Sequence, residues 1–122
     1  MQHTYNSLAM DWATDWDALF GVQRPIIVEI GFGNGDYLIA LAKQYPDHHV
    51  IGFELSTPSL EKAETKIKRS KLDNVIAIYS RGETAINHLF KPESVAQIHI
   101  NYPDPWFKAR HAERRIMQRD ML

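Results

Sequence analysis

Acidic side chains beside closely spaced glycines are the groups in this sequence whose types and spacing could bind a ligand and support chemistry. Three alternate glycines (Gly31, Gly33 and Gly35) interrupt residues 26–37, which read I-I-V-E-I-G-F-G-N-G-D-Y, and Glu29 precedes the first of them by two positions. Glycine lets the backbone adopt positive φ angles and approach a ligand closely, and the free N–H groups of a following helix would face the same place. We therefore expect a ligand-binding loop here; the alternative is a tight turn next to a strand-end acid.

A second acid, Glu54, follows the glycines by about twenty residues and closes the apolar run 49–53. Nucleotide-binding α/β folds place a carboxylate at the end of their second strand, where it binds both ribose hydroxyls. Glu54 fits this role, although a solvated strand-end acid would look the same. The two motifs together predict a nucleoside-containing cofactor.

The glycine spacing narrows the choice of cofactor. The dinucleotide fingerprint is G-x-G-x-x-G, whereas this loop reads G-x-G-x-G. The shorter spacing resembles that of S-adenosylmethionine-binding methyltransferases, whose cofactor has no pyrophosphate but carries a sulfonium and an amino group. The Glu29 carboxylate would attract such cationic groups.

A third acid, Asp104, lies in the segment N-Y-P-D-P-W-F-K at residues 101–108. The flanking prolines fix φ at positions 103 and 105 and hold their neighbours extended, so the carboxylate would sit on a stiff turn suited to a reacting centre. The alternative is a proline-rich turn with a packed tryptophan. The basic run that follows, K-A-R-H-A-E-R-R at 108–115, favours a phosphate-bearing polymer as substrate.

Alternating strand and helix patterns organise these segments into an α/β fold with a parallel sheet, in which the carboxyl ends of the strands meet at one edge. The N-terminal residues 1–22 predict a covering helix, with Ser7 as its N-cap and Gly21 as its end. Its apolar stripe comprises Leu8, Trp12, Trp16, Leu19 and Phe20. Strands are expected at 26–30, 49–55, 75–79 and 95–100, and helices at 38–45, 57–67 and 83–90.

Length and composition set broader limits. The 122 residues carry a net charge of −1 and contain no cysteine, so we expect one domain without disulfides or thiolate metal sites. The six histidines show no metal-ligand spacing, and apolar runs are too short for a signal peptide or a membrane span. A cytoplasmic protein that binds neither metal nor membrane is therefore expected.

Three segments together closely resemble the bacterial tRNA (guanine-N7-)-methyltransferases. They are E-I-G-F-G-N-G at 29–35, I-G-F-E at 51–54 and P-D-P-W-F-K-A-R-H-A-E-R-R at 103–115. The resemblance spans residues 19–122, and its third segment is highly specific. It implies a Rossmann-like class I methyltransferase fold, S-adenosylmethionine as methyl donor, and a guanine in the tRNA variable loop (position 46) as acceptor.

The resemblance also implies roles for individual residues. Glu29, Glu54 and Asp104 would line the cofactor site together with the glycine loop, and Asp104 would be the catalytic residue. Guanine N7 has a lone pair and no proton, so Asp104 would position and stabilise the reacting groups without acting as a base. Substrate and RNA contacts would come from Lys108, Arg110, His111, Arg114 and Arg115.

Some features depart from the family pattern. Family members commonly carry an acid near the adenine in the loop after the third strand, where this chain has Arg81, with Glu83 as a possible substitute. The chain ends at Leu122, whereas complete members continue through further strands, so we expect a C-terminally truncated domain. Two alternatives stay open: an amino-methyltransferase, because N-Y-P-D-P-W loosely resembles motifs that hold an exocyclic amine, and a non-catalytic fragment that binds cofactor or RNA.

Overall fold

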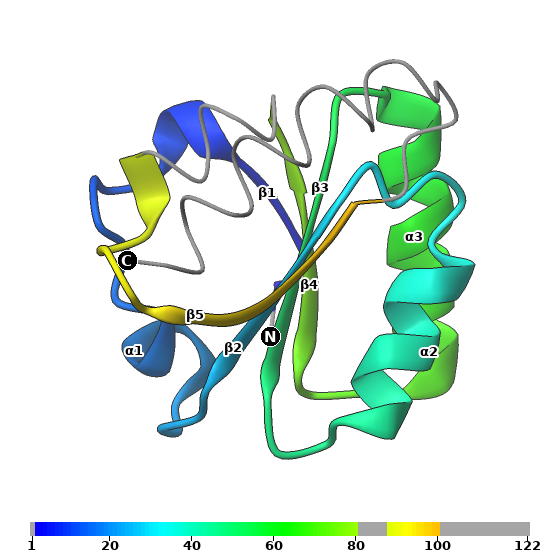
Figure 1. The fold of residues 1–122 in the computed structure, drawn as a ribbon. Coiled ribbons are helices and arrows are strands. Elements are labelled where there is room, and N and C mark those ends of the chain that lie inside the picture. Colours follow the sequence, from blue (N-terminus) through cyan, green and yellow to red (C-terminus); the bar gives the residue numbers. More distant parts are fainter. Residues whose placement is uncertain (1, 81–87, 101–122) are drawn as a thin grey trace.

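A parallel sheet forms the centre of the molecule (Figure 1). The computed structural model describes residues 2–80 and 88–100. Within them five strands pair in the order β1-β4-β3-β2-β5, all parallel, which confirms the expected class I α/β architecture. The strands are β1 (Thr4–Asn6), β2 (Ile26–Ile30), β3 (His49–Glu54), β4 (Val75–Tyr79) and β5 (Val95–Ile100).

Helices α2 (Asp36–Gln44) and α3 (Thr57–Ser70) cover one face of this sheet, and α1 (Trp16–Phe20) lies on the other (Figure 1). Side chains of a strand alternate between the two faces, so β2 sends Ile27 toward α2 and α3, and Val28 toward α1. Every residue of β2 is buried, as its β-branched run predicted. The sheet is therefore a rigid central layer between two apolar clusters.

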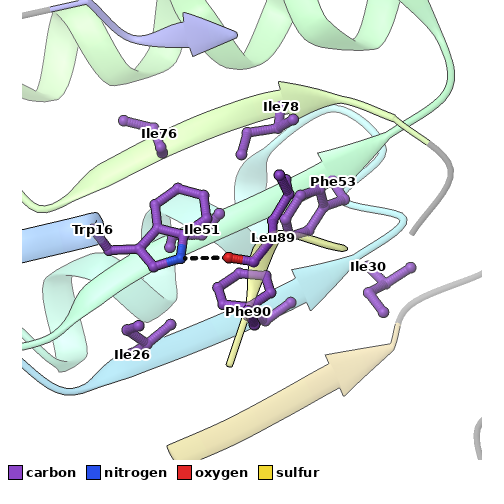
Figure 2. Packing of buried hydrophobic residues seen from close by; sticks show 10 residues of the cluster. Trp16, Ile26, Ile30, Ile51, Phe53, Ile76, Ile78, Leu89 and Phe90 are labelled. Carbon is purple, nitrogen blue, oxygen red and sulfur yellow. Dashed lines mark hydrogen bonds between the residues drawn. The ribbon is translucent and has the colours of Figure 1, made fainter. Parts of the chain in front are cut away.

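The cluster on the α1 face is held by aromatic packing. Trp16 stacks on Phe90 with ring centroids 5.0 Å apart, and its indole N–H donates a 3.2 Å hydrogen bond to the Leu89 carbonyl (Figure 2). Leu89 and Phe90 point inward as expected. Residues 83–87 of the helix expected at 83–90 lie outside the described residues.

The prediction of a helix across the N-terminal residues 1–22 is wrong. Apart from β1, the described residues 2–22 form a 3-10 turn η1 (Ser7–Ala9) and the short α1, while Leu8 and Trp12 are 94% and 74% exposed. Ala13 has φ of 51°, and the backbone N–H groups of Ala13 and Thr14 donate to the carbonyls of His88 and Leu89 at 2.8 and 3.1 Å. Tertiary hydrogen bonds thus replace the helical ones, and Asp15, not Ser7, caps α1 through the Ala18 N–H.

Two further details differ from the sequence-based expectations. Strand β1 was not expected; it pairs with β4 at an edge of the sheet. The pair Thr57–Pro58 predicts Thr57 as the N-cap of this helix, because proline favours the first helical position. In the structure Ser56 caps α3 instead, and its hydroxyl accepts from the Ser59 N–H at 3.3 Å. Gly21 does end α1, with φ of 81°.

The charged outer surface of α2 and α3 contains an open hollow of about 510 Å³, lined in part by Lys43, Lys66 and Arg69. Lys66 pairs with Asp36 across it at 2.6 Å, and this contact holds the pKa of Asp36 below its usual value.

No helix among residues 2–80 and 88–100 is long and apolar enough to cross a bilayer. The same residues contain no cluster of three or more His, Asp or Glu side chains arranged to bind a metal.

Candidate functional site

The glycine loop and Glu54 meet at the carboxyl edge of the sheet. Strands β2 and β3 are neighbours in register, with Ile30 opposite Phe53, so their ends lie side by side. The Gly33 N–H donates to Glu54 Oε1 at 2.9 Å, and the Leu55 N–H donates to Oε2 at 2.8 Å. The structure therefore joins two of the motifs that the sequence singled out.

Glycine is required in this loop at position 35 in particular. Gly35 has φ of 91°, and a Cβ atom added there would lie 3.1 Å from the Cα and Cβ atoms of Ala63 on α3. A side chain would therefore meet both backbone strain and a steric contact. Gly31 is tied to the neighbouring strand, because its N–H donates to the Phe53 carbonyl at 2.8 Å. The loop is thus fixed to β3 on one side and to α3 on the other.

Glu29 is fully buried within β2. It follows Ile27 by two positions, so its side chain lies on the face covered by α2 and α3. Its neighbours in register are Gly52 on β3 and His99 on β5. A Cβ on Gly52 would come within 2.8 Å of Phe32 and Leu38, so this glycine leaves the room that lets α2 pack close to the sheet beside Glu29.

Tyr37 and His99, which the sequence did not assign to the site, contact each other, and His99 is the β5 neighbour of Glu29 in register. The Tyr37 hydroxyl is 2.8 Å from His99 Nδ1, and His99 Nε2 is 3.0 Å from Gln97 Oε1. The position of His99 within the strand expected at 95–100 predicts only a packed histidine. The contact joins positions 62 residues apart, so no local pattern could have indicated it.

The Asp104 segment and the basic run after it come directly after Ile100, where the described residues end. Ile100, the last residue of β5, pairs with Ile30, the residue before Gly31. The chain therefore leaves β5 beside the glycine loop. Several candidate residues lie outside the described residues. From the Asp104 segment and the basic run these are Asp104, Lys108, Arg110, His111, Arg114 and Arg115, and from the loop after β4 they are Arg81 and Glu83.

Comparison with known proteins identifies the family. The family model described as "Putative methyltransferase" matches residues 23–122, which include the glycine loop, Glu54 and the Asp104 segment. The chain belongs to this methyltransferase family. It is also similar in sequence to curated bacterial methyltransferases.

The tRNA (guanine-N(7)-)-methyltransferase of Thermotoga maritima is 44% identical over 108 residues, covering 88% of this chain and 34% of that protein. The Thermus thermophilus protein of the same name is 38% identical over 107 residues, covering 88% and 34%. The chain thus spans about a third of the length of these relatives.

The fold has counterparts among solved structures. A Streptococcus mutans protein solved in complex with S-adenosylhomocysteine superposes with a TM-score of 0.60 at 20% identity, over 84% of this chain and 62% of that one. At this identity the likeness concerns the fold alone. It agrees with the parallel sheet and the helix placement described above.

Proposed function

We propose that this chain forms the cofactor-binding part of an S-adenosylmethionine-dependent tRNA (guanine-N7-)-methyltransferase. The observation that carries the proposal is the 44% identity to a protein of that name across 88% of the chain. The paired glycine loop and Glu54 supply the matching geometry. Because tRNA is the proposed substrate, the enzyme would act in the cytoplasm.

The proposed cofactor would lie along the carboxyl edge of β2 and β3. Each Glu54 oxygen accepts one backbone N–H and keeps a second lone pair, so the carboxylate can still accept hydrogen bonds from two ribose hydroxyls. Gly31, Gly33 and Gly35 let the backbone approach the cofactor without side chains in the way. The buried Glu29 carboxylate would attract the cationic amino-acid end of the cofactor.

The proposed reaction moves one methyl group. The lone pair of guanine N7 attacks the methyl carbon, the C–N7 bond forms, and the C–S bond breaks with its electron pair going to sulfur. S-adenosylhomocysteine leaves, and the positive charge passes from sulfur to the purine without any proton transfer. The protein's task is alignment, which in the proposal falls to Asp104, whose carboxylate would hold the base and offset the charge that appears on it.

The basic segment after Asp104 would bind the RNA. Cationic side chains neutralise phosphates and release counterions, so the proposed RNA affinity should fall steeply with salt. The proposed contact residues are Lys108, Arg110, His111, Arg114 and Arg115.

The test is methyl transfer from labelled S-adenosylmethionine to unmodified tRNA, with the methylated atom identified by mass spectrometry of the digested RNA. The proposal expects 7-methylguanosine and loss of turnover in the Asp104→Ala variant with cofactor binding retained. A product methylated on an exocyclic amine would assign the chain to the amino-methyltransferases instead. Absence of any transfer would support a non-catalytic binding role.

A further inference from the structure

A hydrogen-bonded chain of three side chains runs across the gap between α2 and β5. Burial lowers the pKa of His99, so its ring is neutral near neutral pH and carries one N–H. Gln97 Oε1 can only accept a hydrogen bond, so His99 Nε2–H donates to it. His99 Nδ1 is then the acceptor, and the Tyr37 hydroxyl donates to it at 2.8 Å.

This chain lies where three parts of the proposed site meet. Tyr37 is the second residue of α2 and directly follows the glycine loop. His99 is the second-last residue of β5, the strand that leads into the Asp104 segment. Glu29 is the neighbour of His99 in the β2–β5 register, and paired residues of parallel strands point to the same face.

We propose that Tyr37 and His99 are positioning residues of the proposed cofactor site, holding the glycine loop against β5 and presenting an ordered imidazole beside Glu29. The inference rests on the proposed function, because it assumes that this loop binds the cofactor. Neither residue is assigned contact with the reacting atoms.

The reason lies in the packing around Tyr37. Its side chain is 43% exposed, so packing alone does not fix the ring, and the hydroxyl contact with His99 supplies the remaining restraint. Restraining Tyr37 restrains the first turn of α2, whose backbone N–H groups adjoin the loop. Preorganisation of this kind lowers the ordering cost of ligand binding.

The charge state of the His99 ring would also affect binding of the proposed cofactor. The titratable groups that face it from the packed elements among residues 2–80 and 88–100 are Glu29 on β2 and Tyr37 on α2. A neutral imidazole adds no positive charge beside Glu29, whereas a protonated one would compete with the cationic end of a cofactor for the same carboxylate. The Tyr37 hydroxyl, by occupying Nδ1, favours the neutral ring.

The test compares two matched tyrosine variants. Tyr37→Phe removes the hydroxyl at the start of α2, and Tyr45→Phe removes one at its end, where the hydroxyl has no hydrogen-bond partner among the described residues. The measurements are calorimetric affinity for S-adenosylhomocysteine, amide hydrogen exchange of residues 36–39 without ligand, and the ¹⁵N shifts of the His99 ring. Loss of one hydrogen bond should weaken affinity about fivefold and speed exchange to a similar degree.

Two substitutions of His99 complete the set. His99→Leu should reproduce the effect of Tyr37→Phe, whereas His99→Asn keeps an acceptor near the position of Nδ1 and should restore most of the affinity. In the unaltered protein the ring shifts should report a proton on Nε2, and Tyr37→Phe should shift the Nδ1 resonance, because that nitrogen loses its hydrogen-bond donor. A Tyr37 ring that only packs against His99 would leave the Nδ1 resonance unchanged.

Equal affinity, exchange and ring shifts in Tyr37→Phe and Tyr45→Phe would overturn the inference. So would a failure of the unaltered chain to bind S-adenosylhomocysteine. If the cofactor binds with the expected variant effects but tRNA receives no methyl group, the proposed function fails while this inference stands.

Discussion

The amino edge of the sheet, where the strands begin, and the carboxyl edge, where they end, use polar groups differently. At the amino edge, Asn74 is 1% exposed, and its Nδ2 lies 3.0, 3.0 and 3.2 Å from the carbonyls of Ala42, Tyr45 and His48. At the carboxyl edge, each Glu54 oxygen accepts one backbone N–H and can accept more. The amino edge therefore uses its polar groups to hold the fold together, whereas the carboxyl edge retains hydrogen-bonding capacity at Glu54, which the proposed cofactor would use.

The amino edge contains a second closed contact. His49 is completely buried, stacks on Phe20 with ring centroids 4.2 Å apart, and donates from Nε2–H to Asp17 at 2.7 Å. Burial lowers the pKa of His49, and the hydrogen bond from His49 lowers the pKa of Asp17. This contact fastens α1 to the start of β3.

The largest effect expected from this contrast is on cofactor binding at the carboxyl edge. Glu54→Gln removes the charge that would hold two ribose hydroxyls and should weaken S-adenosylhomocysteine affinity about a hundredfold, since hydrogen bonds to charged groups contribute about 1.5–3 kcal/mol each. Calorimetry measures the loss, and Glu61→Gln on the exposed surface of α3 is the control. Unchanged affinity would show that Glu54 serves only the loop.

The next effect should appear at the amino edge. Asn74→Ala leaves three backbone carbonyls without their donor and should lower the free energy of unfolding by about 2–3 kcal/mol. Urea denaturation measures this, with the neighbouring exposed Asp73→Ala as control. Cofactor affinity should stay the same; a parallel loss of affinity would break the division between the two edges.

A smaller effect is expected where the loop contacts α3. Gly35→Ala should cost about 1–2 kcal/mol of stability, because alanine is strained at φ of 91° and would crowd Ala63. Gly21→Ala is a matched control, since it has φ of 81° and nothing within 4 Å of the added Cβ. Only the Gly35 variant should also weaken cofactor binding, and equal behaviour of both variants would show that crowding at Ala63 is unimportant.

The smallest effect is the pH dependence of the amino edge. The folded-state pKa of His49 lies below its ordinary value of 6.5, so the unfolded chain takes up the proton first and stability falls as pH drops through 6.5. The depressed pKa of Asp17 adds a second loss as pH drops below 3.8. Urea unfolding at pH 7.5, 6 and 5 should show a smaller loss in His49→Phe than in the native protein, the remainder coming from His99, whose pKa is also lowered by burial. An identical slope in both would assign it to other groups.

Short motifs and the parallel topology are enough to predict that the glycine loop and Glu54 lie together. The glycine loop and Glu54 each end a buried strand, and adjacent parallel strands bring such ends together, so their contact at 2.9 Å follows from local pattern. The bounds of β4 and β5 follow from apolar runs in the same way. The roles of these residues in binding stay predictions, as does the placement of Asp104.

Long-range hydrogen bonds explain what the sequence could not predict. The prediction of an N-terminal helix is wrong because the Ala13 and Thr14 N–H groups donate to the carbonyls of His88 and Leu89, and helical periodicity does not reveal such partners. Asn74 and the Tyr37–His99 pair likewise bond across 26 to 62 positions. Their residue types are common in loops and strands, so only the folded arrangement distinguishes them.

The short strand β1 covers the edge of β4. Its three residues pair with Ala77, Ile78 and Tyr79, and the His3 carbonyl accepts a further bond from the Ala77 N–H at 2.9 Å. Without β1, strand β4 would present an uncapped apolar rim that invites pairing with another molecule. Disturbing residues 2–6 would therefore expose β4 as an edge strand at the side of the sheet opposite β5.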